Sequence, residues 1–464
     1  MAWGKSVFAV LATSFAWCAP AGAVSGLAMA AVAPAYAQDD DDDDDEEAGG
    51  GGGIEFDGGD DDGGAAGGVD GGDDDDFGDD ADDAFDGDDE FDPSERAIDD
   101  LLGLQPGEYS FDDSGDLSRP QEILALDLDN DELAIARDLG FRLIERTNLS
   151  SLGGTLDRLA PPSGIDLPSA LDGLSRSLPA APFDYNHIFV LPEGVASEEA
   201  GVKPQSLNPL GQATTGQNVR IGVIDTLPDQ AHPALKGRKL QVRDFAGKGG
   251  RDMVHATGVV SIIAGYDAKA NYSGLLPAAS VWAANVFDIN DKGLPSTDAA
   301  RMVKALDWLA AQDVRVVNMS IAGPESAMLR AVIERLQGRG IIVVAAVGND
   351  GPAAPALYPA AFSGVVGVTA TDLAGNVYRR AGRGDHVDFS APGVGLRAAV
   401  DGGRYGSVTG TSFATPVVAA MIGLRAANRT GGGLDLRDIP VRDLGASGRD
   451  RTFGAGIVVL EAGG

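Results

Sequence analysis

One serine in this chain is placed to act as a nucleophile. Ser412 lies in a run of glycines and small hydroxyl residues, 406–416, that leads into the apolar stretch 417–424. Thr411 can begin a helix, which would place Ser412 near N–H groups and the positive dipole end that favour developing negative charge. Thr-Ser before a helix is also an ordinary cap. A nucleophile therefore needs a base, an orienting carboxylate and an oxyanion donor elsewhere in the chain.

A base and a carboxylate are available upstream. His255 opens the segment 255–265 of small and apolar residues, and imidazole is the usual general base near neutral pH. Asp225 directly follows the apolar run 219–224, where a carboxylate could reach a histidine, although an Asx turn or a helix cap would use the same residue. His386 lies between two aspartates, but no second ligand cluster accompanies it, so we predict a surface loop there.

An oxyanion donor could come from Asn349, which follows the apolar run 341–346 in the sequence Gly-Asn-Asp-Gly. Its side-chain NH₂ could donate to a developing oxyanion. Ordinary turn chemistry also places asparagine between glycines, so this residue alone does not decide between the two interpretations.

Alternating strands and helices from residue 218 onward would position these side chains. Apolar runs predict strands at 219–224, 280–287, 314–319, 341–346 and 365–369, and the segments between and after them predict helices at 255–265, 296–311 (capped by Ser296 or Thr297), 325–337 and 412–427. This alternation predicts an α/β fold, a parallel twisted sheet with helices on both faces. Ligands of such sheets lie beyond the carboxyl ends of the strands, where Asp225 and Asn349 fall.

Residues 218–464 resemble the subtilisin-like serine peptidases, or subtilases. The resemblance rests on Val223-Ile224-Asp225-Thr226, His255-Ala256-Thr257, Gly348-Asn349 with Tyr358-Pro359-Ala360, Phe389-Ser390-Ala391-Pro392-Gly393, Gly410-Thr411-Ser412-Phe413-Ala414-Thr415-Pro416 and Gly454-Ala455-Gly456. The order Asp, His, Ser is also that of subtilisin. Two positions depart from the family pattern, since Leu227-Pro228 and Ala256 stand where glycine is usual. Neither change removes a reacting group.

The resemblance implies a serine endopeptidase that acts on polypeptide substrates. It implies a catalytic triad of Asp225, His255 and Ser412, with Asn349 as the oxyanion donor. It also implies an edge strand that binds extended substrate, formed by Ser320, Ile321, Ala322 and Gly323, with Gly348 nearby. No cofactor is required, although family members often carry stabilising calcium. A catalytically silent binding or scaffold protein of the same fold, and an esterase with the same triad, remain as alternatives.

A small unit precedes this region, at 120–192. Periodicity predicts strands at 122–126, 141–145, 154–159 and 186–191 and helices at 130–139 and 167–178, with Ile135 on the apolar side of the first helix. The β-α-β-β-α-β order predicts a ferredoxin-like α+β domain. It is similar to the inhibitory propeptide of subtilases, which would act on its own chain, and an independent binding domain is the alternative. The linker 193–217 should then contribute to a processing site between about residues 189 and 205.

The acidity of the chain is concentrated in one tract. The net charge is −36 over 464 residues, and residues 39–92 carry 28 acidic side chains and no Lys or Arg, which leaves −8 for the rest. Low hydrophobicity and charge repulsion predict a disordered spacer at 38–119, apart from a short helix at 94–102. An organised calcium-binding array is the alternative, but the Asp-Gly runs lack a regular repeat. No basic footprint for nucleic acid is present.

The first 37 residues predict an export signal. Lys5 precedes a charge-free, Ala-rich stretch, and Ala35-Tyr36-Ala37 is a small-x-small cleavage site. The stretch is long enough to cross a bilayer, so an uncleaved anchor is the alternative. We expect cleavage, no stable membrane anchor and a periplasmic or extracellular protein. Cys18 is the only cysteine, so no disulfide can form within the chain.

Overall fold

The computed structural model describes residues 104, 107–191, 206–207, 215–247, 253–290, 293–428 and 434–460. The predicted signal peptide, most of the acidic spacer, the helix expected at 94–102 and most of the linker 193–217 lie outside the described residues. Among the helices that are described, none has the length and apolar character needed to cross a membrane.

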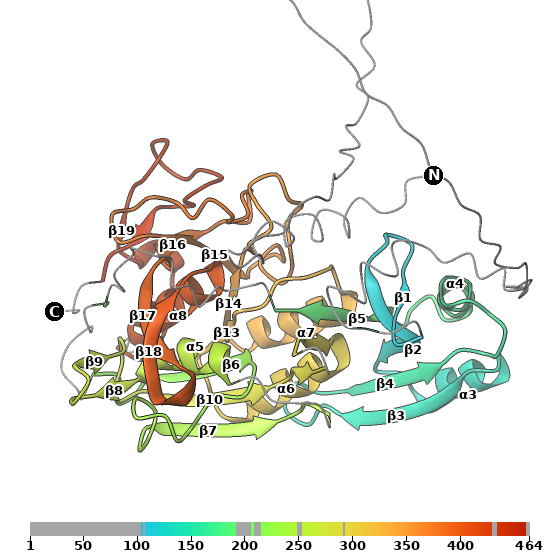
Figure 1. Cartoon of the computed structure of the whole chain (residues 1–464). Coiled ribbons are helices and arrows are strands. Elements are labelled where there is room, and N and C mark those ends of the chain that lie inside the picture. Colours follow the sequence, from blue (N-terminus) through green and yellow to red (C-terminus); the bar gives the residue numbers. More distant parts are fainter. Residues whose placement is uncertain are drawn as a thin grey trace, which may run out of the picture. The chain divides into compact units, whose positions relative to one another are not determined.

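A nine-stranded sheet forms the centre of the region from residue 219 onward (Figure 1). All neighbouring strands are parallel except the first pair, so the predicted parallel sheet is confirmed. In spatial order the strands are β19 (Val441–Arg442), β20 (Ile457–Val458), β16 (Phe389–Pro392), β15 (Val366–Thr371), β14 (Ile342–Ala346), β13 (Val316–Met319), β6 (Arg220–Asp225), β10 (Ser280–Asn285) and β7 (Lys239–Asp244).

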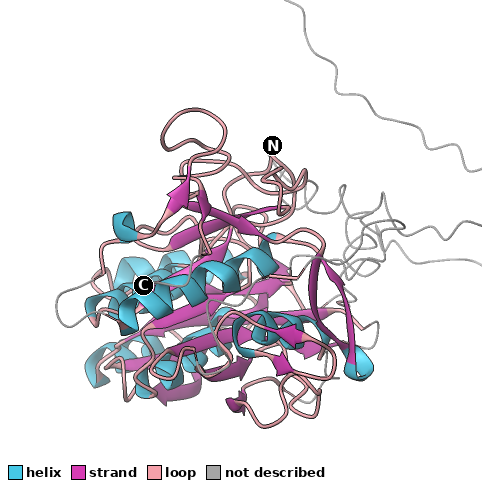
Figure 2. Cartoon of the chain, turned by 90° about the vertical axis from the view of Figure 1, so that its left-hand side faces the viewer, coloured by secondary structure: helices cyan, strands magenta, loops and turns pink. Residues whose placement is uncertain are grey.

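Helices cover both faces of this sheet, as Figure 2 shows. One face packs against α5 (Val254–Ala264) and α8 (Thr411–Ala427), and the other against α6 (Ala299–Ala311) and α7 (Ala327–Gly338). Two short hairpins complete the region, β8 (Tyr266–Asp267) with β9 (Tyr272–Ser273) and β17 (Leu396–Val400) with β18 (Arg404–Val408), together with 3₁₀ turns at Asp401–Gly403 and Leu436–Asp438.

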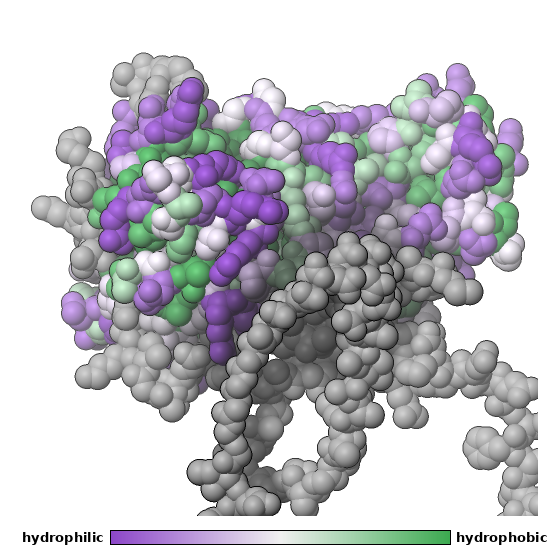
Figure 3. All heavy atoms as spheres, turned by 90° about the horizontal axis from the view of Figure 1, so that it is seen from above, coloured by the Kyte–Doolittle hydropathy of each residue, from purple (hydrophilic) through white to green (hydrophobic). Residues whose placement is uncertain are grey.

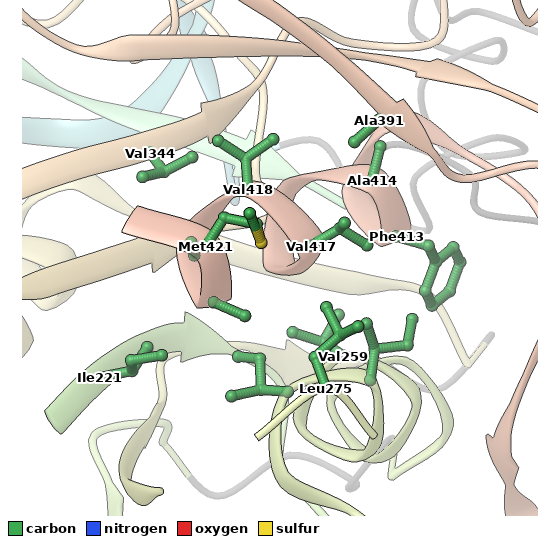
Figure 4. Packing of buried hydrophobic residues seen from close by; sticks show 14 of the residues in the cluster. Ile221, Val259, Leu275, Val344, Ala391, Phe413, Ala414, Val417, Val418 and Met421 are labelled. Atoms are coloured by element: carbon green, nitrogen blue, oxygen red, sulfur yellow. The ribbon is translucent and has the colours of Figure 1, made fainter. Parts of the chain in front are cut away.

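The side chains of the central strands point alternately toward the two helical layers. Val344 belongs to the apolar cluster that contains α8, whereas its neighbour Val343 belongs to the cluster that contains α6 and α7. Figure 4 shows Val418 and Met421 of α8 beside Val344. Successive side chains of a strand point to opposite faces, so a strand buried on both faces reads as a continuous apolar run. This explains why these strands could be predicted from the sequence.

The N-terminal domain has the ferredoxin-like order expected from the sequence. Its elements are β2 (Leu117–Leu126), α3 (Asn130–Asp138), β3 (Arg142–Asn148), β4 (Thr155–Ala160), α4 (Leu167–Ser177) and β5 (Phe183–Val190). The strands form an antiparallel sheet in the order β5-β2-β4-β3. Leu133 and Ala136 face the core of this domain, but Ile135 is 42% exposed, so its assignment to the apolar side was wrong.

A hairpin from the C-terminal region joins this sheet. The strand β12 (Pro295–Asp298) pairs with β5 and, on its other edge, with β11 (Asp288–Ile289). The prediction of a helix from residue 296 was therefore wrong at its start. The helix α6 begins at Ala299, and Asp298 caps it by accepting a hydrogen bond from the Arg301 N–H at 3.1 Å.

The domain also begins earlier than predicted. Residues 107–119, assigned to the disordered spacer, include β1 (Ser110–Phe111), which pairs with the first residues of β2. Tyr109 is buried and packs with Leu104 and Ile188. The spacer prediction was wrong here because a few apolar residues find partners on β5, which a composition average does not reveal.

Apolar residues are dispersed on the described surface. On the face seen in Figure 3, hydrophobic residues are interspersed with hydrophilic ones. The exposed large apolar side chains among the described residues are Ile135, Leu139, Ile144, Ile165, Met253 and Leu373. Four of these belong to the N-terminal domain, as expected for a unit too small to bury all of its apolar side chains.

Candidate active site

Asp225 and His255 meet at the carboxyl edge of the central sheet. Asp225 is the last residue of β6, and His255 is the second residue of α5. His255 Nδ1 lies 2.8 Å from Asp225 Oδ1, and both side chains are buried. A buried carboxylate is costly unless it is hydrogen-bonded, and Asp225 Oδ1 also accepts from the Thr226 N–H at 2.7 Å.

Thr226 links the end of β6 to the start of α5. Its hydroxyl accepts a hydrogen bond from the Ala256 N–H at 3.1 Å, which ties the residue after Asp225 to the residue after His255. The Asp229 N–H donates to Thr257 Oγ1 at 2.7 Å, so the loop carrying Leu227-Pro228 still docks on α5. Both departures from the family pattern are therefore accommodated without separating the carboxylate from the imidazole.

Ser412 is the second residue of α8, in the first turn of that helix. The preceding Gly410 has φ of 150°, in the range that favours glycine, and donates its N–H to the Gly393 carbonyl at 2.9 Å. Phe413 lies against the imidazole of His255, with ring centroids 5.1 Å apart. Ser412 and His255 thus belong to one buried cluster, in which Ser412 Oγ has no hydrogen-bond partner among the described residues.

The carbonyl of Ser412 depends on a donor from another segment. A regular helix would supply the N–H of residue 416, but Pro416 has none. Ser320 Oγ donates instead to the Ser412 carbonyl at 2.7 Å, and Asn318 Nδ2 donates to Ser320 Oγ at 3.0 Å. The start of α8 is thereby fixed to the segment that follows β13.

The amide of Asn349 is oriented by Thr411. Asn349 Oδ1 accepts hydrogen bonds from the N–H and the hydroxyl of Thr411, both at 3.0 Å. Because a backbone N–H can only donate, the oxygen of the amide must face Thr411. The Asn349 NH₂ group then faces away from Thr411 and is a donor in the immediate neighbourhood of Ser412.

The segment predicted to bind substrate differs from the expectation. Residues 320–323 form no strand, and Gly323 alone makes an isolated bridge, exchanging two 2.9 Å hydrogen bonds with Tyr358. Residues 320–322 have no strand partner among the described residues, so the predicted pairing with extended substrate stays a prediction. Ser320 and Ile321 are fully buried, while Ala322 and Gly348 are buried close to each other. Their contribution to substrate binding stays a prediction.

Three supporting residues were missed at the sequence level, namely Thr226, Thr411 and Ser320 in its role as a donor to Ser412. One signal was available for the last of these. Pro416 stands four residues after Ser412, so a helix through both must find an outside donor for the Ser412 carbonyl. No sequence rule identifies which segment supplies it.

Metal ligands do not gather around this site. The residues that the structure describes contain no group of three or more His, Cys, Asp or Glu side chains able to hold an ion. The arrangement offers a buried carboxylate–imidazole pair, a hydroxyl at a helix N-terminus and an oriented amide donor, which together suit nucleophilic attack on a carbonyl carbon.

Comparison with known proteins assigns the family. Residues 216–456 match the subtilase family. The minor extracellular protease Epr of Bacillus subtilis is 32% identical over 254 residues, which are 53% of this chain and 39% of Epr. A subtilisin of Bacillus pumilus is 32% identical over 219 residues, which are 46% of this chain and 78% of that protein. The match to subtilisin E of Bacillus subtilis, 30% identical and covering 51% of this chain, spans 64% of that protein.

A solved structure shares the fold. The crystal structure of fervidolysin from Fervidobacterium pennivorans, a keratinolytic enzyme related to subtilisin, aligns with a TM-score of 0.60 and 18% identity. The alignment covers 76% of this chain and 62% of fervidolysin, so it extends beyond the central sheet and its helices.

Proposed function

The chain belongs to the subtilase family, and on that premise we propose that it is an exported serine endopeptidase made as a self-processing precursor. The observation that carries the proposal is the 2.8 Å contact between Asp225 and His255 beside the start of the helix that bears Ser412. This is the set of groups that peptide hydrolysis through an acyl-enzyme requires.

Each group has a defined role in the proposed reaction. Ser412 Oγ attacks the carbonyl carbon of a peptide bond while His255 Nε2 takes its proton, and the imidazolium then gives that proton to the departing amine. Asp225 accepts from His255 Nδ1–H, which selects the required tautomer and stabilises the imidazolium. The Asn349 NH₂ and the backbone N–H of Ser412 hold the oxyanion. Water releases the acyl group by the same steps in reverse.

The N-terminal domain is the proposed propeptide. Its strand β5 pairs antiparallel with β12, in the register Val190 with Ser296 and Phe189 with Thr297. Phe189 is fully buried, and a Cβ on Gly323 would collide with its ring. The end of β5 therefore lies against the segment that follows β13, next to Ser320, which binds Ser412. This position favours a cleavage site shortly after β5.

Apolar packing joins the domain to the helices α6 and α7. Leu124, Leu126 and Leu156 of the N-terminal sheet belong to the same buried cluster as Val303 and Leu306 of α6. Burial of this kind contributes about 25 cal/mol per Å² of apolar surface and is non-directional. A face of the C-terminal region would be exposed to water without this domain, which supports a role as a folding partner and inhibitor in cis.

Charged groups fix the orientation of that contact. Asp184 Oδ2 accepts hydrogen bonds from Ser326 Oγ at 2.8 Å and the Met328 N–H at 3.3 Å, at the positive end of α7. Lys304 of α6 lies 2.7 Å from Glu145. Burial opposes ionisation of Glu145, but hydrogen bonds from Lys304 and Arg158 lower its pKa to about 2.

Export is proposed from two observations. The first 37 residues have the pattern of a cleavable signal, and one relative is an extracellular protease by name. Polypeptides of the periplasm or the surroundings of the cell are then the substrates.

Self-processing is tested by comparing the purified chain with its Ser412→Ala variant. The wild type should yield a fragment that begins between about residues 189 and 205, at a rate independent of protein concentration, and Ser412→Ala should accumulate uncut. Ser407→Ala, five residues earlier on β18, is the matched control and should be cut like the wild type. A fluorophosphonate probe should label Ser412 alone. Processing of Ser412→Ala at the same bond in a host lacking other peptidases would refute self-cleavage, and a folded mature sample without label would refute the peptidase.

A further inference from the structure

The position of the acyl group follows from the two segments that hold Ser412. They leave the neighbouring parallel strands β13 and β14 at the same edge of the sheet. Ser320 binds the carbonyl of Ser412, and Asn349 binds the N–H of Thr411. A peptide carbonyl attacked by Ser412, with its oxygen at the Asn349 amide, would therefore lie close to both segments.

A leucine occupies the space on that side of the nucleophile. A Cβ built on Gly348 would lie 2.6 Å from Leu357 Cδ1 and 3.6 Å from the Cβ of Ala322. The three residues therefore converge on one point, directly next to Asn349. We call the region that they bound the acyl-side space, because it adjoins the carbonyl carbon that Ser412 attacks.

The backbone of Leu357 is fixed beside this space. The next residue, Tyr358, exchanges two 2.9 Å backbone hydrogen bonds with Gly323, and the Leu357 carbonyl accepts from the Ala361 N–H at 3.1 Å. The backbone is thus held on both sides of the leucine, while its side chain is only half-buried. A larger group could enter only if the bridge broke or if the Leu357 side chain turned to another rotamer.

From this arrangement we infer that Leu357 is a specificity-determining residue that closes the acyl-side space to large side chains. The substrates are peptides with glycine or alanine as the residue that donates the attacked carbonyl, and aromatic or leucine side chains at that position are excluded. The inference rests on the proposed peptidase function. One misfitting methylene in an apolar pocket costs about 10- to 200-fold in kcat/KM, so the discrimination should be large.

The test uses the processed enzyme and the substrates succinyl-Ala-Ala-Pro-X-p-nitroanilide, in which X is Ala, Leu or Phe. For the wild type, kcat/KM with X = Ala should exceed that with X = Phe by at least about 10-fold. Leu357→Gly and Leu357→Ala should move the Phe-to-Ala ratio upward by about 10-fold or more. The matched control is Leu373→Ala, at an exposed leucine in the turn after β15, which should leave the ratio unchanged.

The outcomes separate the inference from the function on which it rests. A wild-type enzyme that is labelled by a fluorophosphonate but prefers X = Phe or Leu overturns the inference and leaves the peptidase standing. Well-folded Leu357 variants that keep the wild-type ratio overturn it as well. If the variants do not fold, the ratio measured on the wild type alone still decides. A processed, folded enzyme that cleaves no substrate and takes no label refutes the proposed function, and the inference falls with it.

Discussion

The hydroxyl of Ser320 should matter because it replaces a donor that the helix lacks. Its bond to the Ser412 carbonyl is 2.7 Å long and fully buried, and Pro416 cannot serve that carbonyl. Ser320→Ala leaves a buried acceptor unsatisfied, which costs about 1–3 kcal/mol. In a region of roughly 250 residues this corresponds to a fall of about 2–12 °C in melting temperature.

A second substitution tests the cause. Pro416→Ala gives residue 416 an N–H that can reach the Ser412 carbonyl from within α8. In the Ser320→Ala background it should recover about 1 kcal/mol that is not recovered in the wild-type background. The four proteins are compared by thermal unfolding at one scan rate, all carrying Ser412→Ala so that self-digestion does not contribute.

The control is a buried serine that makes no such bond. Ser390 on β16 is fully buried, and its Oγ has no hydrogen-bond partner among the described residues, so Ser390→Ala leaves no partner unsatisfied and should not lower the stability. The reasoning is refuted if Ser320→Ala melts like this control. A coupling between Ser320 and Pro416 below about 0.5 kcal/mol would refute it too, because unrelated sites add to within that amount.

Three further outcomes are expected. Asp225→Asn should lower kcat by about 10⁴, the loss known for a chymotrypsin-type triad, with little change in melting temperature; near-normal turnover would mean that another carboxylate orients the imidazole. Burial opposes the charged form of His187, but Asp112 and Asp184 raise its pKa from 6.5 to about 9. This contribution to stability is complete below pH 6.5 and lost as the pH rises through 9, so the uncut precursor should melt lower at pH 10 than at pH 7, and His187→Gln should flatten that difference. Deleting residues 39–92 should leave activity and melting temperature nearly unchanged, and a large drop would show that the tract packs on the body.

Residues at strand ends were predictable from the sequence because the sheet is parallel and buried on both faces. The run 219–224 is apolar apart from Arg220 at its start, so the next charged residue, Asp225, marks the carboxyl edge. His255, Asn349 and Ser412 were each assigned to the end of a strand or the start of a helix, and the structure brings all four to one edge. Contacts between distant segments, such as that of Ser320 with Ser412, could not be predicted from the sequence.

Two errors of the sequence interpretation concern segments that join the N-terminal sheet. Residues 295–298 look like the capped start of a helix, and residues 107–119 look like an extension of a polar spacer. Residues 295–298 become a strand because they pair with β5, which is far away along the chain. Residues 110–111 pair with the nearby start of β2, and the neighbouring Tyr109 packs on Ile188 of β5. In both segments the contacts with the N-terminal sheet outweighed the local preference of the sequence.

Because β5 pairs with both β2 and β12, cleavage of the chain after β5 would not by itself release the N-terminal domain. The second half of β5 is held on both edges, since Ser118 pairs with His187 on one side and Ser296 with Val190 on the other. Cutting the chain after Val190 removes none of these bonds, nor the contact of Asp184 with α7. The proposed cleavage therefore requires only that the chain beyond β5 reach Ser412. Release requires opening a strand that has no free edge, so the cut domain should remain bound as an inhibitor until the domain itself is unfolded or digested.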